Sequence, residues 1–374
     1  MSMVEWKKLG EAEDIGLLTL GRGQVISKKD MNDCPGNYPV YSSSSQGNGE
    51  IGRYGRYMFD DERITWSIDG GGRLFYRNNQ KYSVTNVCGW LKVNKPEVLN
   101  TRFLYFSLYN QWSNISFNYN HKAHPSVIRN EYFVPLPSLL EQQRIVSILD
   151  TFTSSIANLK QQIEERRKQY EYERDRLLDM EGKEGVEMKK LGDVCDTLSG
   201  FPFDSSLFKD SGIQLMRGAN VKRGFFDFNE DLNKYWESSE GLEKYLLEPN
   251  DIIISMDGSL VGRSFCYLKK EHLPLLLVQR VARIRTSENF KYIYYNITKT
   301  FPDYVDSKKT AGAIPHISMK DINNFPIPLP SLKEQSRIVS ILDTFEASIK
   351  NLEEQLALRE KQYEYYRNQL LTFE

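Results

Sequence analysis

The stretch of this sequence that most resembles a catalytic motif is PDYVDSKK, residues 302–309. Its Asp303, Asp306 and Lys308 follow the order of acids and lysine that metal-dependent nucleases use to hold a cation at a phosphate. In those nucleases one carboxylate lies on one strand and the Asp-x-Lys pair on another, and the spacing here is too tight for two strands. We therefore interpret the segment as a basic turn after a helix, with nuclease chemistry as the weaker alternative.

Two other features could carry chemistry. His121 and His124, in the segment HKAH, could bind a metal, but no third ligand lies nearby in the sequence, so a polar loop is favoured. Asp69 and Asp257 each precede a glycine between strand-like runs. A catalytic role would require acidic partners that the sequence does not show, so both Asp-Gly pairs are interpreted as hairpin turns.

Motifs for methyl transfer and nucleotide hydrolysis are missing from the sequence. It has no Asn-Pro-Pro-Phe or Asp-Pro-Pro-Tyr segment and no glycine-rich phosphate loop ending in Gly-Lys-Ser or Gly-Lys-Thr. Cys34, Cys88, Cys195 and Cys266 are scattered without a C-x-x-C pair, which argues against a disulfide framework or a zinc site. We predict no catalytic residue, no metal site and no bound cofactor on this chain.

Composition indicates an ordinary globular protein. The 374 residues are 40% hydrophobic and 12% aromatic, enough for the cores of two or three domains. The net charge of −1 does not decide whether the partner is a polyanion, because the distribution of charge matters more than its sum. Leu273–Val278 is the longest apolar run and is too short to cross a bilayer, so we predict a cytoplasmic protein without membrane contact.

The elements that position these residues occur twice. PLPSLLEQQRIVSILDTF, residues 135–152, returns almost unchanged as PLPSLKEQSRIVSILDTF, residues 328–345. Upstream, VEWKKLGE pairs with VEMKKLGD, ITWSIDG with IIISMDG, and RFLYFSL with KYIYYNI, all in the same order. The chain is therefore a tandem duplication, in which each copy is a globular region followed by the repeated element.

The repeated element is predicted to be a long helix. Ser138 with Glu141, and Ser331 with Glu334, fit a capping box in which the serine oxygen accepts the N3 amide and the glutamate reaches back to the cap amide. Apolar residues then follow the 4-3-4-3 spacing of a coiled-coil seam. The seam residues are Ile145, Leu149, Phe152, Ile156, Leu159 and Ile163 in the first copy, and Ile338, Leu342, Phe345, Ile349, Leu352 and Leu356 in the second.

Neither helix can bury this seam alone, so the other copy is the simplest partner. About 40 residues would make a rod of roughly 60 Å. Arg166 and Arg359 occupy equivalent seam positions. They could fix the register and orientation of the pair, or they could be snorkelling side chains near solvent, and the sequence does not separate these alternatives.

Each globular region shows a mixed α and β pattern. Short β-branched or aromatic runs alternate with Gly, Ser and Asn turns, and DIIISMDG and LLLVQRVARIR are predicted strands of the second region. RFLYFSLYNQW and NFKYIYYNITKTF are predicted helices. Their aromatic residues are predicted to pack in the domain cores rather than to stack on bases. These aromatic residues are Phe103, Tyr105, Phe106, Tyr292, Tyr294 and Tyr295.

Two variable-looking regions, each closed by a PLPSLxEQxRIVSILD helix, closely resemble the specificity subunits of type I restriction-modification systems. The resemblance spans essentially the whole chain. It implies an α+β protein with two mixed α/β target-recognition domains separated by two long helices in an antiparallel coiled coil, with pseudo-two-fold symmetry. The expected boundaries are 1–137 and 181–330 for the recognition domains, 138–180 for the first helix and linker, and 331–374 for the second helix.

The resemblance also implies a function without catalysis on this chain. The subunit would read a bipartite, asymmetric site on double-stranded DNA. Two modification subunits would methylate adenine with S-adenosylmethionine, and separate restriction or motor subunits would use ATP and Mg²⁺. Two alternatives are weighed against it. They are a related protein with its own nuclease centre, and a coiled-coil adaptor that binds only proteins.

Within the recognition domains, loops rich in glycine and polar residues are the predicted DNA contacts, because they offer close backbone approach and hydrogen-bond donors. In the first domain these residues are Ser43, Ser44, Gln46, Asn48, Arg53, Arg56, Arg73 and Arg77. In the second they are Arg217, Asn220, Lys222, Arg223, Ser259, Arg263, Lys308 and Lys309.

Overall fold

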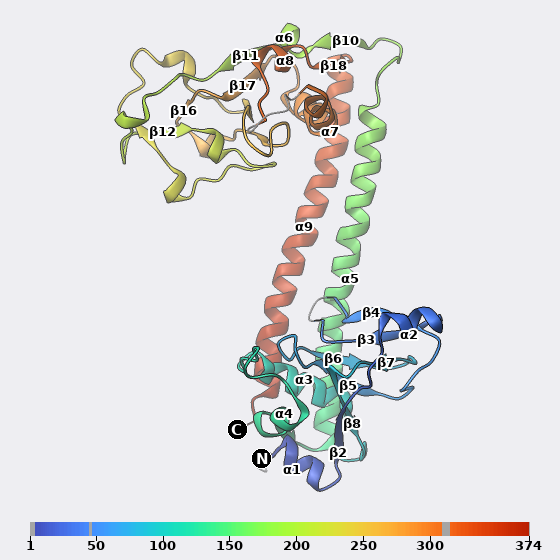
Figure 1. Ribbon diagram of the computed structural model, residues 1–374. Helices are drawn as coiled ribbons and strands as arrows, with labels where there is room; N and C mark the ends of the chain where they lie inside the picture. The colour runs from blue at the N-terminus through green and yellow to red at the C-terminus, as the bar shows by residue number, and fades with distance from the viewer. Residues whose placement is uncertain (1–3, 45–46, 309–314, 374) are drawn as a thin grey trace. The chain divides into compact units, whose positions relative to one another are not determined.

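The computed structural model describes residues 4–44, 47–308 and 315–373 (Figure 1). The chain forms two compact units, Met1–Gln162 with Leu352–Glu374, and Ile163–Asn351. Each unit therefore contains one globular region and half of each long helix. The domain boundaries expected from the sequence, which treat the helices as separate segments, stay a prediction.

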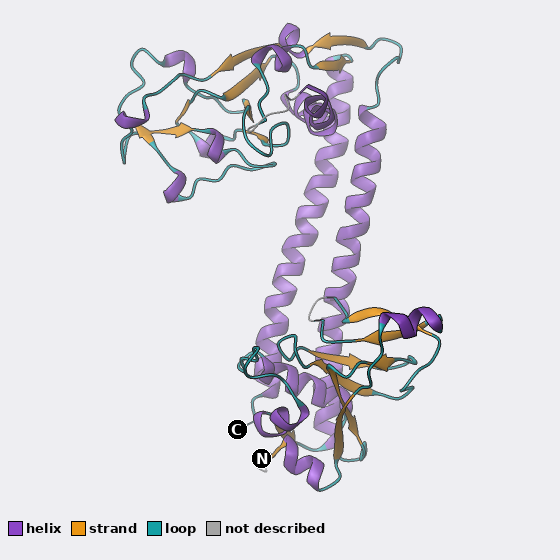
Figure 2. Cartoon of the chain, viewed as in Figure 1, coloured by secondary structure: helices purple, strands orange, loops and turns teal. Residues whose placement is uncertain are grey.

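The first globular region is built from short strands and four helices among its described residues (Figure 2). Its elements are β1 (Glu5–Lys8), α1 (Leu9–Asp14), β2 (Leu18–Arg22), α2 (Lys28–Asp33), β3 (Tyr38–Tyr41), β4 (Glu50–Tyr54), β5 (Arg63–Ser67), β6 (Leu74–Arg77), β7 (Ser83–Val84), β8 (Cys88–Val93), α3 (Thr101–Trp112), α4 (Pro125–Glu131) and β9 (Phe133–Leu136). The sheets have the strand orders β2-β8-β5-β6, β4-β3-β7 and β1-β9.

The second globular region repeats this plan with longer loops. Its strands and α-helices are β10 (Glu187–Lys190), α6 (Leu191–Val194), β11 (Cys195–Ser199), β12 (Ile213–Met216), β13 (Tyr235–Trp236), β14 (Ile252–Ser255), β15 (Phe265–Tyr267), β16 (Leu275–Leu277), β17 (Val281–Thr286), α7 (Phe290–Lys308), α8 (Met319–Asn323) and β18 (Pro326–Leu329). Five 3₁₀ turns lie between them, at Ser205–Leu207, Gly218–Asn220, Glu230–Leu232, Glu243–Tyr245 and Lys270–His272. The sheets have the orders β11-β17-β14-β15, β13-β12-β16 and β10-β18.

Equivalent strands pair in the same way in both regions. β1 pairs with β9 and β10 pairs with β18, both antiparallel, so the start of each region is joined to the segment just before its long helix. β5 pairs with β6, and β14 with β15, also antiparallel. The Asp-Gly pairs lie in the connections of these two hairpins, which confirms the turn prediction for Asp69 and Asp257.

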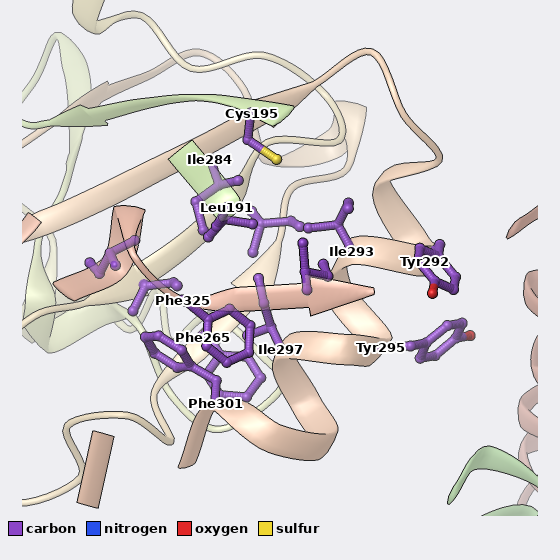
Figure 3. Close-up of a cluster of buried hydrophobic side chains, with 14 of the residues drawn as sticks. Leu191, Cys195, Phe265, Ile284, Tyr292, Ile293, Tyr295, Ile297, Phe301 and Phe325 are labelled. Atoms are coloured by element: carbon purple, nitrogen blue, oxygen red, sulfur yellow. The ribbon is translucent and has the colours of Figure 1, made fainter. Parts of the chain in front are cut away.

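Aromatic residues of α3 and α7 fill the cores, as predicted. Phe103 and Phe106 are 0% and 1% exposed in the first core, and Tyr292 and Tyr295 are 0% and 2% exposed in the second. Figure 3 shows α7 side chains gathered with Phe265 and strand residues of the second core. Burial of such large side chains is the main favourable term holding each helix against its sheet.

Two predictions about the second region are wrong. LLLVQRVARIR is not one strand, because β16 ends at Leu277 and β17 begins at Val281. PDYVDSKK is not a turn after a helix, because residues 302–308 form the last turns of α7. Phe301 and Val305, both 0% exposed, anchor this end of α7 in the core and keep the chain helical past Pro302.

The repeated elements are the helices α5 (Leu139–Leu178) and α9 (Leu332–Leu371). The serine half of each capping box is confirmed, because the N–H groups of Glu141 and Glu334 each donate to the serine three residues earlier at 3.3 Å. The glutamate half is wrong. Glu141 binds Arg144 through two hydrogen bonds of 2.8 and 2.7 Å, and a guanidinium with two donors outcompetes the single cap amide.

Each helix is fixed to its own globular region by the same contacts. Gln142 accepts the N–H of Asn100 at 2.8 Å, and the equivalent Gln335 accepts that of Asn289 at 3.1 Å. Both glutamines are 0% exposed. An ion pair follows in each copy, Arg102 with Asp150 and Lys291 with Asp343, each at 2.6 Å.

Within each unit α5 and α9 pack antiparallel. One contact occurs in both units, and the residue that α5 supplies in the first unit is supplied by α9 in the second. We call it the exchanged contact. In the first unit the rings of Phe152 and Tyr363 lie 6.5 Å apart, with the Arg359 guanidinium 5.6 Å from the Phe152 ring. In the second unit Phe345 and Tyr170 lie 6.5 Å apart, and the guanidinium of the arginine at position 166 is 5.7 Å from the Phe345 ring. The arginines thus stack on the opposite helix, which favours the register role over snorkelling.

The predicted seam serves two purposes along its length. Ile145, Leu149, Ile338 and Leu342 are 0% exposed and belong to the cores of the globular regions. Ile163 is buried, whereas the other seam residues between the helices are only half-buried. These half-buried residues are Phe152, Ile156, Leu159, Phe345, Ile349, Leu352 and Leu356.

Candidate nucleic-acid interface

The predicted contact loop between β3 and β4 is partly folded onto its own domain. Ser43 and Ser44 are half-buried, whereas Asn48 is exposed. The side-chain oxygen of Asn48 accepts the N–H of Glu50 at 2.9 Å, which fixes the end of the loop. Gln46 lies outside the described residues.

Three arginines of the first domain differ in how far they are engaged. Arg53 is exposed, and its Nε lies 3.1 Å from Glu50 Oε1. The half-buried Arg73 lies over the Phe75 ring, with its guanidinium 5.3 Å from the ring centre. Arg56 is exposed and its side chain bonds to no other residue in the described part of the chain. Arg56 is therefore the freest of the three to bind a phosphate or a base edge.

Arg77 occupies a different environment, because it is only 5% exposed. Its Nε donates to Thr65 Oγ1 at 3.1 Å, its Nη2 donates to the Asn48 carbonyl at 2.7 Å, and its guanidinium lies 3.5 Å from the centre of the Tyr41 ring. Burial lowers the pKa of Arg77. These contacts favour a structural role, in which Arg77 holds the Asn48 loop against the sheet.

The segment MRGANVKRG of the second domain combines a structural residue with exposed cations. Asn220 is 0% exposed, accepts the N–H of Arg217 at 3.1 Å and donates to the Asp227 carbonyl at 2.9 Å. It therefore fixes the turn from within. Lys222 is half-buried, with its Nζ 3.9 Å from Asp227 Oδ2. Arg223 is exposed, and its side chain has no partner among the described residues.

The remaining predicted contacts surround the end of α7. Arg263 forms two hydrogen bonds with Asp306, of 3.1 and 2.6 Å, and this ion pair raises the pKa of Arg263. Ser259 and Lys308 are exposed, and Lys309 lies outside the described residues. Asp306 thus acts as an ion-pair partner here. In the described ranges, no group of three or more His, Cys, Asp or Glu residues is placed to hold a metal ion.

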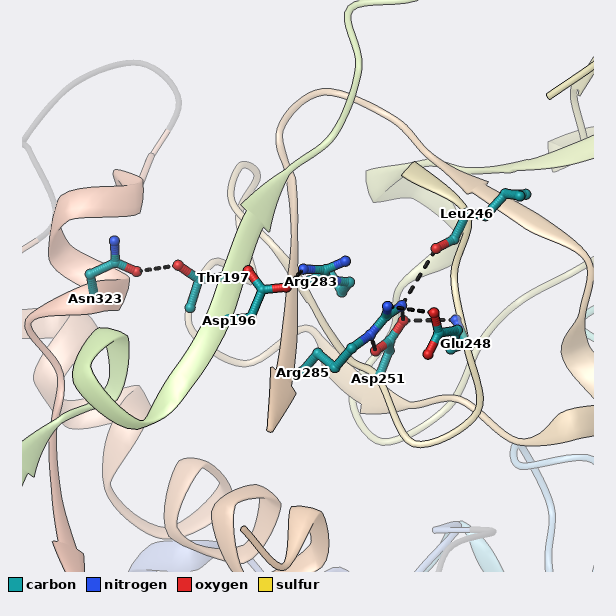
Figure 4. A network of polar contacts seen from close by, with 8 residues as sticks. All are labelled: Asp196, Thr197, Leu246, Glu248, Asp251, Arg283, Arg285 and Asn323. Atoms are coloured by element: carbon teal, nitrogen blue, oxygen red, sulfur yellow. Dashed lines mark hydrogen bonds and ion pairs between the residues drawn. The ribbon is translucent and has the colours of Figure 1, made fainter. Parts of the chain in front are cut away.

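Basic residues on the second sheet are also engaged internally, as Figure 4 shows. Arg285 of β17 donates to both carboxylate oxygens of Asp251 at 2.7 Å and to Glu248 at 2.5 Å. The neighbouring Arg283 is 5% exposed and pairs with Asp196. These cations stabilise the sheet, so the basic residues of the sequence overstate the charge that is available to a ligand.

A polar cluster that the sequence analysis did not single out lies where β16 and β17 separate. We call it the second corner and define it as Asp257, Gln279, Arg280 and His316. Asp257 Oδ2 accepts Arg280 Nη1 at 2.9 Å, and its Oδ1 lies 2.5 Å from His316 Nδ1. The Arg280 side chain is 71% exposed, so it is held at one end and open to a ligand at the other.

The second corner borders an open cleft of about 500 Å³. Besides corner residues, the cleft is lined by Phe203, Ser205, Phe208, Arg217, Gly218, Ala219, Ser255, Gly258 and Val278. Arg217 stacks over Phe208 at 5.7 Å and reaches the Leu232 carbonyl at 3.4 Å. A cleft that combines arginine, glutamine and hydroxyl groups can read the hydrogen-bonding pattern of base edges.

Backbone hydrogen bonds fix the second corner from both sides. The N–H of Met256 donates to the Arg280 carbonyl at 2.9 Å, and the N–H of Ile317 donates to the Met256 carbonyl at 3.0 Å. The hairpin of β14 and β15, the β16–β17 turn and the segment before α8 are thereby joined at a single point.

The first domain contains the same backbone arrangement, which we call the first corner and define as Asp69, Asn86, Val87 and Lys122. The N–H of Ile68 donates to the Val87 carbonyl at 3.1 Å, and the N–H of Ala123 donates to the Ile68 carbonyl at 3.2 Å. By these bonds Val87 occupies the place of Arg280, and Lys122 that of His316. Lys122 Nζ lies 2.9 Å from Asp69 Oδ1, and this hydrogen bond raises the pKa of Lys122.

The loop before Lys122 presents an aromatic side chain to solvent. Tyr119 is 86% exposed, and Lys122 Nζ lies 5.2 Å from the centre of its ring. His121 stacks on Phe117 and lies 3.7 Å from Glu131, while His124 is the N-cap residue of α4. HKAH is thus a polar loop in the structure, as favoured from the sequence.

Comparison with known proteins identifies relatives of the whole chain. The family model described as type I restriction modification DNA specificity domain matches twice, at residues 3–166 and 183–358. A Mycoplasma pneumoniae protein named a type I specificity subunit is 29% identical over 366 residues, covering 94% of each chain. The specificity subunit of the Escherichia coli type I restriction enzyme EcoR124I/EcoR124II is 34% identical over 252 residues, covering 64% of this chain and 61% of that one.

Solved structures show the same fold. The type I restriction-modification S subunit of M. genitalium superposes with a TM-score of 0.64 at 16% identity, covering 100% of this chain and 97% of that one. The HsdS subunit of Thermoanaerobacter tengcongensis gives a TM-score of 0.51 at 18% identity, covering 99% and 97%. In the part of the chain that the structure describes, no helix has the length and apolar character to span a membrane.

Proposed function

The chain belongs to the family of type I restriction modification DNA specificity domains, and on this premise we propose that each of its halves reads one half of a bipartite, asymmetric DNA site. Its function as the DNA-specificity subunit of a type I restriction-modification system follows from that membership and from its full-length relatives. The proposal adds how the reading is divided between the two halves.

The observation that carries the proposal is the pair of corners. Both domains join the same three segments with equivalent backbone hydrogen bonds, yet they present different side chains at equivalent places. Val87 in the first domain stands where Arg280 stands in the second, and Lys122 where His316 stands. A common scaffold with different donors is what two readers of different sequences require, so the DNA site should be asymmetric.

We further propose that the chain itself is not catalytic and that it supplies recognition to other subunits. Two modification subunits would bind to it and methylate adenine with S-adenosylmethionine, while restriction or motor subunits would use ATP and Mg²⁺. The twofold repetition of the helices supports two modification subunits, because exposed residues near the start of α5 recur in α9. These are Arg144, Ser147 and Thr151, which recur as Arg337, Ser340 and Thr344. We propose the cytoplasm, where such a complex meets its DNA, as its location.

DNA binding measured against salt and sequence tests the proposal. The chain, assembled with its modification subunits, is titrated with duplex DNA that contains or lacks its methylated motif, between 50 and 200 mM salt. Contacts to several phosphates should weaken binding steeply as salt rises, and the motif should bind about 10³-fold or more tightly than unrelated DNA.

The alternatives give different results in this titration or in a cleavage assay of the chain alone. An adaptor that binds only proteins would show no binding dependent on salt or sequence. A chain with its own nuclease centre would cut DNA with Mg²⁺ in the absence of other subunits, and changing Asp303 and Asp306 to asparagine would abolish the cutting. Either result would contradict the proposed function.

A further inference from the structure

We propose that Arg280 recognises a guanine in the half-site read by the second domain, and that Asp257 is the residue that positions Arg280 for this contact. The inference rests on the proposed function, since it assigns a base and a reader to one half of the DNA site. It concerns the second corner alone, and the first corner supplies the internal control.

The backbone at Arg280 is the first observation. The N–H of Val281 donates to the Val278 carbonyl at 3.2 Å, which closes a four-residue turn with Gln279 and Arg280 at its centre. Arg280 has a φ of 64°, in the left-handed region that glycine or asparagine normally occupies at this position of a turn. An arginine here is strained where a glycine would not be, so its side chain has a purpose that the turn does not explain.

The turn is also fixed on every side. Gln279 donates its N–H to the Phe201 carbonyl at 2.8 Å, and Val278 donates to the Met216 carbonyl at 3.1 Å. The Arg280 carbonyl accepts the N–H of Met256 at 2.9 Å. The Cα atom from which the guanidinium projects is therefore held in place before any ligand binds, which is the requirement for a side chain that must meet a base edge accurately.

The side-chain contacts of Arg280 leave its Nε and Nη2 donors without a partner among the described residues. Only Nη1 is bonded within the described residues, to Asp257 Oδ2 at 2.9 Å. A guanidinium has five N–H donors, so the parallel pair on Nε and Nη2 stays available. That pair matches the O6 and N7 acceptors of guanine, the commonest base contact of arginine in the major groove.

Asp257 is suited to position this side chain, because it is itself fixed. Its Oδ1 lies 2.5 Å from His316 Nδ1, its carbonyl accepts the Ser255 hydroxyl at 3.2 Å, and its side chain is only 21% exposed. Both carboxylate oxygens are thus engaged, one with Arg280 and one with His316. The carboxylate limits the rotamers of Arg280, whose side chain stays 71% exposed.

The first corner lacks this arrangement. Val87 takes the place of Arg280 and has no side-chain donor, and Asp69 binds Lys122 instead. A lysine ammonium is a point charge without the planar pair of donors that guanine accepts. The two corners should therefore contribute differently to their half-sites, and a change at one should leave the half-site of the other intact.

The test uses the full chain assembled with its modification subunits, and duplexes in which each base pair of the methylated motif is replaced in turn. The wild-type complex should discriminate for guanine at one position of the second half-site. Arg280→Ala should reduce this discrimination by about 5- to 150-fold and leave every other position unchanged. Arg280→Gly, which removes the backbone strain, should reduce the discrimination by the same factor. Thermal unfolding of both variants checks that they fold.

A double-mutant cycle separates positioning from a structural role. Asp257→Asn should reduce discrimination at the same position by a smaller factor than Arg280→Ala does. Arg280→Lys should keep only part of the wild-type discrimination. Combining Asp257→Asn with Arg280→Ala should give no further loss beyond Arg280→Ala, because both changes act through one contact. Lys270→Ala, an exposed lysine of the same domain, and Lys122→Ala in the first corner should leave this position unchanged.

Several results would overturn the inference while the proposed function stands. They are a second half-site without a discriminated guanine, an Arg280→Ala complex with an unchanged motif, and an equal loss on all sequences with a smaller salt dependence, which indicates a phosphate contact. Failure of the proposed function would appear separately, as a wild-type complex that has no sequence preference at all.

Discussion

The two corners share equivalent backbone hydrogen bonds, but they differ in their side chains and in the backbone at one position, where Arg280 has a φ of 64° and Val87 is not left-handed. In both domains an Asp-Gly hairpin, the turn before β8 or β17, and the segment before α4 or α8 are joined by equivalent hydrogen bonds. On this common set of hydrogen bonds the first domain places Lys122 and an exposed Tyr119, and the second places Arg280 and His316. On the proposed function, the duplicated scaffold would set where a DNA-reading side chain lies, and the residue that differs between the copies would set which base it reads.

The helices show the opposite relation, because their side chains are repeated as well. Phe152 meets Tyr363 and Arg359 in the first unit, and the equivalent residues make the same contact in the second, with ring distances of 6.5 Å in both. Repetition is therefore closer in this helix contact than in the side chains of the two corners. Five experiments test this contrast.

Removing one copy should have the largest effect. A chain that ends at Met180 keeps the first domain and α5, and α5 carries both Phe152 and Tyr170, the two residue types of the exchanged contact. Two such chains should pair antiparallel and, with modification subunits, methylate a palindromic site made of the first half-site and its inverted repeat. Sequencing of methylated DNA gives the motif. Methylation of a direct repeat or of one isolated half-site would show that α5 does not impose this symmetry.

Charging the exchanged contact should have the next largest effect. Phe152→Lys together with Phe345→Lys places two ammonium groups in the seam and should lower the free energy of unfolding by roughly 3 kcal/mol or more. Copurification with modification subunits should fall in parallel. Tyr172→Lys with Tyr365→Lys is the matched control, since these equivalent tyrosines are 68% and 61% exposed. Stoichiometric assembly of the phenylalanine variant would count against the seam as the element that holds the pair.

Replacing a buried and an exposed arginine of the first domain should separate effects on stability from effects on recognition. Arg77→Ala removes a buried cation together with its two hydrogen bonds and should destabilise the first domain by about 3 kcal/mol. Arg56→Ala should change the free energy of unfolding by less than about 0.5 kcal/mol. Urea unfolding measures both. If Arg77→Ala proves neutral for folding but alters the methylated motif, Arg77 contacts DNA despite its burial.

Two exposed arginines without described partners test the independence of the halves. Arg56→Ala should relax only the first half-site, and Arg223→Ala only the second, each by roughly 1–3 kcal/mol if the contact is to a base edge. The same prediction holds for Arg53→Ala and Arg73→Ala in the first half-site. Binding to duplexes altered in one half-site at a time measures each loss. An equal loss at both half-sites would indicate general electrostatic attraction.

The smallest effect is expected at the helix caps. Ser138→Ala and Ser331→Ala each remove one hydrogen bond to the N3 amide and should cost about 1 kcal/mol or less, equally in both copies. Thermal unfolding of the two variants gives the comparison. A clear difference between them would mean that the repeated helix starts are not energetically equivalent.

Sequence reasoning predicted the helices and their seam because those patterns are local and repeat every few residues. It failed where partners compete or come from far away. The seam period could not show that Ile145 and Leu149 would enter a domain core, and the capping signature could not show that Arg144 would take the glutamate. Likewise, an arginine in a polar loop looks the same whether it is buried like Arg77 or exposed like Arg56.

The second corner was hidden for a different reason. Gln279 and Arg280 lie in a mostly apolar run that has the composition of one strand. A local turn, held by tertiary hydrogen bonds of Val278 and Gln279, breaks the run into β16 and β17. Asp257 and His316 are 59 residues apart in the chain, so no local pattern joins them. The one available signal was the repeat itself, because the duplicated Asp-Gly pair marked the same place in both halves.

Sequencing the methylated DNA of cells that express this chain with its modification subunit would show whether one chain carries two independent DNA-reading domains on a common scaffold. We expect one bipartite motif, with two different specified half-sites separated by bases that are not read. A single continuous motif, or a motif that is unchanged when this chain is absent, would contradict it.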